Sequence, residues 1–401
     1  MARNNALVSP NILVWARDRL NLTLEAAAEY TGVKPETLKF WEDGSAYPTV
    51  NQAKELAHKY KIPYVYFFLP TPPQNIKLPK GQNYRTIDNI PVTGQSVELT
   101  ALLYDIVQRR DVMLDLYKDM ETPLPKFKHF FNADTTGNGD IAAAIRRILD
   151  LPDEPIKLDD RQSFNYLRAK LEKIGILVFQ AVKIDTAEMR GLSVYYDTFP
   201  IIVVNRSDAY YARNFTLIHE LAHLITKTAG ICNETSLFAK SPIQIERRCN
   251  QIATLVLAPD NLLVNDIAVT QLIQNWEDYR VRNIANKYYI SREVLIGRLY
   301  SLKLITNDFY NEKLRQYIRE YKNSHPSDVK SDGFIRPETN TGSQFGKIYV
   351  RTILAAFSQE LISPRDAVQF FNGLRLSHFD KLERWCFSWV TKNMPSIQTH
   401  L

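Results

Sequence analysis

The segment 215–224, with the sequence F-T-L-I-H-E-L-A-H-L, constrains this chain more than any other stretch. It contains an H-E-x-x-H motif, formed by His219, Glu220 and His223. On a helix, residues four apart lie one turn above each other on one face, so the two imidazoles can bind one metal ion. The glutamate between them can reach a water molecule on that metal. The apolar flanks predict a buried helix. A chance match on an ordinary buried helix is the alternative, and a second feature downstream argues against it.

Two histidines leave zinc short of a third protein ligand, and the segment 245–259 offers one. Its sequence, I-E-R-R-C-N-Q-I-A-T-L-V-L-A-P, predicts a buried helix that ends at the proline. Glu246 lies at the start of this helix, and its spacing to Asn250 places both on one face. Glu246 would complete a His2Glu site with water in the open position. Asn250 would hold one of the zinc-binding side chains in place without binding the metal itself. A solvated first-turn carboxylate is the alternative for Glu246. Glu234 is the alternative candidate for the third ligand. Cys249 is expected to be a small side chain that packs in the core.

Three short apolar stretches before the histidine helix, at 176–181, 191–196 and 200–204, predict the strands of a small sheet. A strand at the edge of a sheet beside a metal site can pair with an extended peptide backbone. The predicted substrate-binding edge strand consists of Leu192, Ser193, Val194, Tyr195 and Tyr196.

Residues 1–70 predict a separate domain of five short helices. A helix over 24–30, a turn at Gly32 and a helix over 35–42 follow one another in this domain, which fits a helix-turn-helix unit. The second of these helices would enter the major groove of DNA. Its groove-facing side chains would be Lys34, Glu36, Thr37 and Lys39.

The charge of this domain limits its affinity for DNA. Residues 1–70 hold eight Lys and Arg against seven Asp and Glu. Counterion release needs several basic contacts with phosphates, so one copy would bind weakly and dimerisation would be the usual remedy. A helical protein–protein module is the alternative.

Two families resemble these segments. The segment 22–48, L-T-L-E-A-A-A-E-Y-T-G-V-K-P-E-T-L-K-F-W-E-D-G-S-A-Y-P, resembles the XRE (Cro/phage repressor-like) family. The blocks G-L-S-V-Y-Y, P-I-I-V-V-N, R-N-F-T-L-I-H-E-L-A-H-L and E-R-R-C-N-Q-I-A-T-L-V-L-A-P look like the ImmA/IrrE family of zinc metallopeptidases. One departure is that Arg248 and Cys249 stand where that family more often has Glu and Ala.

The second resemblance implies a gluzincin-like endopeptidase with a narrow substrate, often joined to an XRE module and encoded beside the repressor that it cleaves. By motif position, His219, His223 and Glu246 would be zinc ligands and Glu220 the general base. The sequence does not identify the residue that would donate a hydrogen bond to the oxyanion. Weak candidates are Arg213, Tyr210 and Tyr211, on the approach to the helix.

The leading hypothesis is a transcriptional regulator that binds operator DNA and cleaves one regulatory protein, a repressor or a toxin–antitoxin partner, encoded nearby. The residues favour an enzyme, because a pure scaffold would not need Glu220. The alternative is a non-catalytic XRE-type repressor or antitoxin that uses the zincin fold for binding or sensing.

We expect an α+β, mostly helical chain with a central zincin-like domain and a small sheet. The expected parts are the helix-turn-helix domain (1–70), a linker and helical spacer (71–155), the zinc domain (156–305), a linker (306–345) and a C-terminal helical module (346–401). Within the zinc domain, 275–304 looks like a second helix-turn-helix and is interpreted as packing support. The C-terminal module is a candidate for partner binding or homodimerisation.

The amino-acid composition indicates the cellular environment and the partners that these parts can have. A formal net charge of +6 is compatible with a nucleic-acid partner but does not require one. The three cysteines lie far apart without a C-x-x-C, so a reducing compartment fits. Without a signal-like N-terminus or a bilayer-length apolar run, a soluble cytoplasmic protein without membrane contact is expected.

Overall fold

The computed structural model describes residues 5–73, 84–85, 96–132, 135–227, 242–266, 277–324 and 335–387. These residues form two compact units. The first unit holds the described residues up to 73 together with 96–108, and the second holds the others. The helix α5 (Val97–Asp119) contributes residues to both units. No helix within the described ranges is both long and apolar enough to cross a lipid bilayer.

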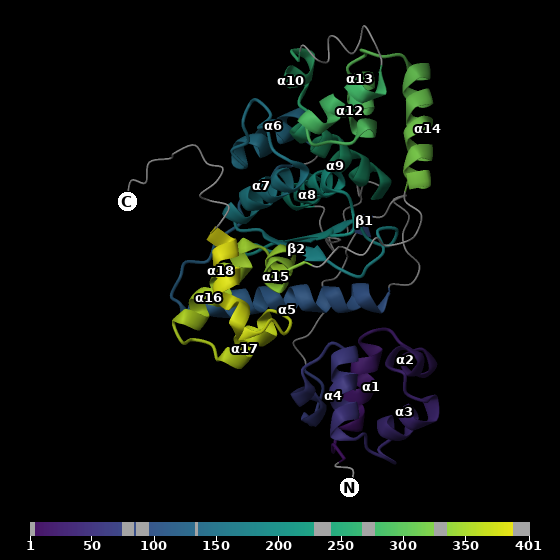
Figure 1. Ribbon diagram of the computed structural model, residues 1–401, viewed down its shortest axis with the longest axis vertical. Coiled ribbons are helices and arrows are strands. Elements are labelled where there is room, and N and C mark those ends of the chain that lie inside the picture. Colours follow the sequence, from purple (N-terminus) through teal and green to yellow (C-terminus); the bar gives the residue numbers. More distant parts are fainter. Residues whose placement is uncertain are drawn as a thin grey trace. The chain divides into compact units, whose positions relative to one another are not determined.

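The first unit is the predicted bundle of five short helices (Figure 1). The side chain of Thr23 accepts a hydrogen bond from the Ala26 amide and caps the second helix, which ends at Gly32 with a φ of 75°. Leu38 and Trp41 face a core shared by all the helices. The elements are α1 (Pro10–Asp18), α2 (Leu24–Thr31), α3 (Pro35–Glu42), α4 (Val50–Lys59) and the short 3-10 helix η1 (Tyr64–Phe68).

The second unit is built around a mixed sheet with the strand order β1-β3-β4-β2. Strand β2 runs parallel to β4, and β3 runs antiparallel to both β4 and β1. Every residue of β2, β3 and β4 is buried, so both faces of the sheet are covered. The strands are β1 (Tyr84–Arg85), β2 (Leu177–Ala181), β3 (Gly191–Val194) and β4 (Ile201–Asn205).

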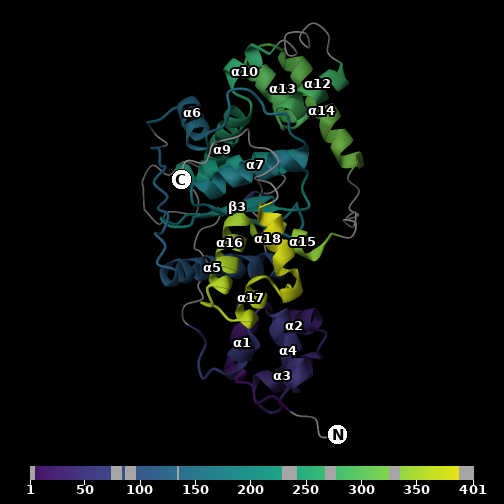
Figure 2. The same cartoon turned by 60° about the vertical axis from the view of Figure 1, so that its left-hand side comes forward.

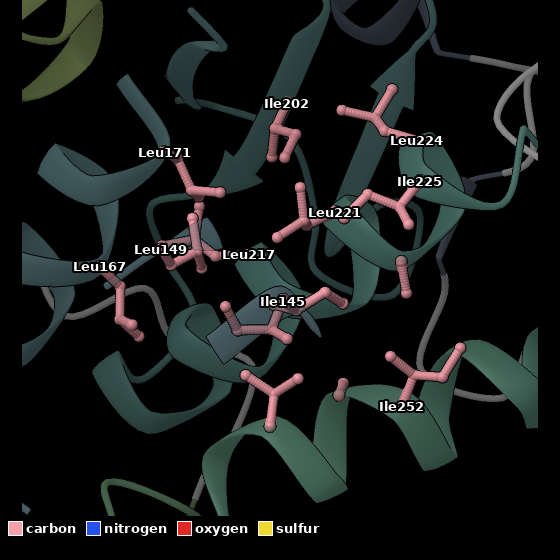
Figure 3. Close-up of a cluster of buried hydrophobic side chains, with 14 of the residues drawn as sticks. Ile145, Leu149, Leu167, Leu171, Ile202, Leu217, Leu221, Leu224, Ile225 and Ile252 are labelled. Atoms are coloured by element: carbon pink, nitrogen blue, oxygen red, sulfur yellow. The ribbon is translucent and has the colours of Figure 1, made fainter. Parts of the chain in front are cut away.

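One face of the sheet is covered by α6 (Asn138–Ile148), α7 (Asp160–Lys173), α8 (Tyr210–Ile225) and α9 (Pro242–Leu257). Their apolar side chains meet those of β2 and β4 in one core (Figure 3). Ile145 from α6 lies inside this core, beside Leu217 and Ile252. The segment 71–155 was predicted as a linker and helical spacer, and the apolar stripe of its helix α6 completes the core of the central domain.

The opposite face of the sheet is covered by the C-terminal helices (Figures 1 and 2). Phe179 of β2 lies edge-on to Tyr349, with ring centres 5.8 Å apart. The buried ion pair between Arg168 and Glu172 of α7 joins the two layers, because Glu172 accepts hydrogen bonds from the Lys347 amide. The helices are α15 (Pro337–Phe345), α16 (Lys347–Ser358), α17 (Pro364–Phe370), η2 (Leu376–His378) and α18 (Phe379–Phe387).

The predicted linker over 306–345 is wrong for its described residues. An 18-residue helix, α14 (Asn307–Ser324), occupies its first half, and α15 occupies its end. Helix α14 packs with α10 (Asp260–Val264), α12 (Asp278–Lys287) and α13 (Arg292–Ser301) around a second core.

The segment that resembles a second helix-turn-helix forms α12 and α13. Leu295, Ile296 and Leu299 of α13 are buried, and Arg298 forms an ion pair with Asp260. Such a helix offers little free surface to a DNA groove, which agrees with its interpretation as packing support.

Candidate metal centre

Helix α8, which carries the H-E-x-x-H motif, is enclosed on all sides. Its residues from Asn214 to Ile225 are all buried, as expected for a helix that is apolar around its circumference. Strand β3 lies directly against it. A Cβ atom built on Gly191 would lie 2.2 Å from Cγ2 of Thr216, so this close approach requires glycine.

The three predicted ligands converge on one point. Nε2 of His219 and Nε2 of His223 lie 3.1 Å apart, and each is 3.2 Å from one oxygen of the Glu246 carboxylate. Around a tetrahedral zinc ion with bonds of ~2.0–2.1 Å, ligand atoms lie about 3.4 Å apart. The observed triangle is close to that size, and its donor set is one that zinc uses with water in the fourth position. These residues therefore fit a zinc ion.

The electrostatics of the ligands suit a cation. Burial acts to raise the pKa of Glu246, but hydrogen bonds from His219 and His223 outweigh it and hold that pKa well below its usual range. Burial acts to lower the pKa of His223, but neighbouring Cys249 and Glu246 raise it well above its usual range. Metal binding at such a site releases a proton, so its affinity falls as the pH falls.

Glu220 is fixed by strand β3. The hydroxyl of Ser193 donates a hydrogen bond of 2.7 Å to Oε2 of Glu220, and both side chains are buried. Ser193 was predicted to belong to a substrate-binding strand, and its contact with Glu220 was not predicted. Nothing in the spacing of two residues on different elements could have revealed it.

Cys249 is also closer to the metal centre than expected. It lies in the core, as expected from the sequence, and it is near enough to His223 to raise the pKa of that imidazole. The available signal was its position one turn after Glu246 on α9. Asn250 is half-buried, and its carbonyl accepts a hydrogen bond from Thr254. Its predicted role in orienting a ligand remains a prediction.

The predicted edge strand is shorter than expected and partly covered. Strand β3 ends at Val194, so Tyr195 and Tyr196 lie beyond it. On its outer side, β1 pairs with Gly191 and Leu192. The alternative third ligand, Glu234, lies outside the described residues.

The donors considered for an oxyanion are engaged elsewhere. Arg213 donates hydrogen bonds to the carbonyl of Asp208 and to Oε1 of Gln180, and its guanidinium lies 4.3 Å from the ring centre of Tyr210. These contacts fix the turn that leads into α8. Tyr211 is half-buried.

In the first unit, the predicted recognition helix is α3. Lys34, Glu36 and Lys39 are exposed, whereas Thr37 is half-buried. Phe40, which was not among the predicted contact residues, lies on the same helix with half of its surface exposed. A solvent-facing aromatic side chain on a short amphipathic helix is a signal that could have been used.

Comparison with known families follows the same division of the chain. A family model described as the IrrE N-terminal-like domain, peptidase family M78, matches residues 171–300. A helix-turn-helix model matches residues 13–67. No curated protein and no solved structure matches the chain. The family models thus find an XRE-type helix-turn-helix domain at 13–67 and an IrrE/ImmA-like peptidase M78 domain at 171–300, in agreement with the two resemblances in the sequence.

Proposed function

We propose that this chain is a DNA-binding transcriptional regulator that also cleaves one regulatory protein with a zinc-dependent endopeptidase site. The convergence of His219, His223 and Glu246 beside the buried Glu220 is the observation that supports it. The match to a peptidase family and the attached helix-turn-helix domain point in the same direction.

Zinc held by these three ligands would supply Lewis-acid activation of water and of the scissile carbonyl. Glu220 removes the proton of the attacking water and later gives it to the leaving amine. Ser193 holds the Glu220 carboxylate in one orientation, so the base needs little reorganisation during the reaction. Because β1 pairs with Gly191 and Leu192, the substrate backbone extends along the rest of β3, at Ser193 and Val194, and past Tyr195 and Tyr196.

The partners follow from the two activities. The first unit binds an operator through Lys34, Glu36, Thr37 and Lys39 of α3, and a homodimer gives it sufficient affinity. The protein substrate is a repressor or toxin–antitoxin partner encoded near this chain. Asn250 supports a zinc ligand from the next turn of α9.

Zinc content tests the metal centre directly. The purified chain should contain about one zinc ion, which His219→Ala combined with His223→Ala should remove. His58→Ala, at an exposed position on α4, is the matched histidine control and should retain it. Unchanged zinc affinity in the double variant would refute the site.

Cleavage of the protein encoded next to this chain tests the chemistry. Co-expression followed by mass spectrometry of the products should reveal one cut with the wild-type chain. Glu220→Gln should abolish the cut and keep zinc, because the amide cannot accept the proton. If reporter repression persists unchanged in Glu220→Gln and no cut is found, the non-catalytic repressor or antitoxin is the better description.

A mobility-shift titration at low salt tests DNA binding. The chain should shift a fragment of its own promoter, and Lys39→Ala should weaken binding and flatten its salt dependence by about one unit of slope. Lys303→Ala, in the second unit, is the control with unchanged binding. The absence of a shift even at low salt would argue for the protein–protein alternative.

A further inference from the structure

A pocket apart from the metal centre opens in the second unit between the loop 151–158, α7, the last turn of α9 and the end of α12. Its cavity volume is about 70 Å³ and its mouth opens to solvent, so a ligand would insert one part into it and extend outward. Small-molecule sites are lined mainly by apolar and aromatic groups, with a few polar groups that fix the orientation of the ligand. The walls here include Tyr166, Leu167, Val256, Leu257, Tyr288 and Tyr289.

The loop that closes this pocket is held in place without a helix or strand of its own. Nη1 of Arg146 donates to the carbonyl of Val256 at 2.7 Å, and Nη2 donates to the carbonyl of Pro152 at 2.5 Å. The hydroxyl of Tyr289 accepts a hydrogen bond of 2.6 Å from the Leu158 amide and donates to the carbonyl of Ile156. The walls are therefore formed before any ligand arrives, which lowers the entropic cost of binding.

The lining defines the chemistry of the occupant. Three tyrosine rings favour an aromatic body, which they can meet edge-on or face-on. Arg146 is the cation of the lining, and its hydrogen bonds within the described residues go to neutral backbone carbonyls. One anionic group on a ligand would gain a charge-assisted hydrogen bond from it. The exposed Glu154 in the lining disfavours a ligand with several negative charges.

We propose that this pocket binds a small aromatic molecule with a single anionic group, such as a carboxylate, directed at Arg146. The proposal does not depend on peptidase activity, since the metal ligands and Glu220 are absent from the pocket lining.

The pocket touches α9, which carries Glu246, and α7, which a hydrogen bond joins to α8, the helix of the two histidines. Ser163 lines it, and the Ser163 hydroxyl accepts a hydrogen bond of 2.8 Å from Nδ2 of Asn214, a buried residue of α8. Val256 lies on α9, about 15 Å along the helix axis from Glu246. An occupant that shifts the packing of α8 against α9 changes the zinc affinity, and zinc changes the affinity for the occupant by the same factor.

Fluorescence titration of the full chain with 1-anilinonaphthalene-8-sulfonate tests the pocket, because this probe combines an aromatic body with one anionic group. We expect saturable binding of one probe per chain. Ile156→Trp, at the partly exposed rim, should fill the mouth and weaken binding at least tenfold. Leu361→Trp is the matched control, since Ile156 and Leu361 are 39% and 41% exposed, and it should leave binding unchanged.

A second variant tests the role of Arg146. Arg146→Gln should weaken binding of 1-anilinonaphthalene-8-sulfonate but not of its uncharged analogue N-phenyl-1-naphthylamine. Equal losses for both probes would overturn the anion assignment. Binding that does not saturate, or that both tryptophan variants affect equally, would overturn the site. An unchanged zinc affinity at saturating probe would overturn the coupling to the metal centre.

Discussion

The distance between a strand and a helix is set by one glycine beside the metal centre. A methyl group at Gly191 would collide with Thr216 and lie 3.1 Å from Oε1 of Glu220. We expect Gly191→Ala to lower the free energy of unfolding by about 1–3 kcal/mol, since overpacking forces neighbouring atoms apart. Thermal denaturation measures this change. Gly297→Ala, on α13 with open space around it, is the control and should be neutral or stabilising.

The contact between Ser193 and Glu220 predicts a kinetic effect. Removing a buried hydrogen bond to a charged group costs about 1.5–3 kcal/mol, so Ser193→Ala should lower kcat for the protein substrate by roughly ten- to a hundredfold. Zinc content and KM should remain near the wild-type values, and Ser193→Thr should restore part of kcat. Loss of zinc together with activity would mean that Ser193 supports the fold instead of the base.

These residues show what the sequence can reveal about the site. Helical spacing identified His219, Glu220 and His223, and a carboxylate on a second buried helix identified Glu246 as their partner. The contact from Ser193 arises only when β3 packs against α8, and no periodicity along the chain encodes such a pairing.

At the scale of elements, Asp278 holds α12 against α14. Burial acts to raise its pKa, but hydrogen bonds from Lys313, Gln316 and Tyr317 outweigh it, so its pKa is lowered in the folded state. Because the pKa of Asp278 is lower in the folded state than in the unfolded state, the ionised side chain stabilises the fold at pH values above the ordinary pKa of aspartate. This stabilisation is lost as the pH falls through the pKa of Asp278 in the folded state.

The protection factors of the α12 and α14 amides against hydrogen exchange should therefore fall in acid, below the ordinary pKa of aspartate. In Asp278→Asn this acid-dependent loss of protection should be absent, because the side-chain amide of asparagine does not titrate. Asp308→Asn, on the exposed start of α14, is the control and should retain the wild-type profile. An identical acid response in Asp278→Asn and the wild type would contradict the assignment.

The helices that the sequence analysis missed have a common physical cause. The nine residues of α15, P-E-T-N-T-G-S-Q-F, have the composition of a loop. Gly342 is present because a Cβ there would lie 2.4 Å from the Trp385 ring, so it marks a close helix contact and not a turn. Such helices form through tertiary packing, which local propensity does not register.

At the scale of the whole molecule, the C-terminal helices complete the second unit. Phe345 is buried, and its ring stacks on Tyr349, which meets Phe179 of the sheet. The sequence predicts a separate helical module here, as a candidate for partner binding or dimerisation. Its contacts with β2 and α7 cover the face of the sheet opposite the metal centre, so it is packed into the second unit.

This arrangement predicts that the C-terminal helices stabilise the metal centre without touching it. Phe345→Ala should lower the free energy of unfolding of the second unit by about 3–5 kcal/mol, because it leaves a cavity against the sheet. Phe387→Ala, at an exposed position on α18, should change it by about 0.5 kcal/mol or less. Deletion of 335–401 should leave β2 and β4 uncovered and abolish both cooperative unfolding of the second unit and zinc binding, while the helix-turn-helix unit remains folded. A truncated chain that binds zinc with wild-type affinity and melts at the wild-type temperature would show that these helices are an independent module.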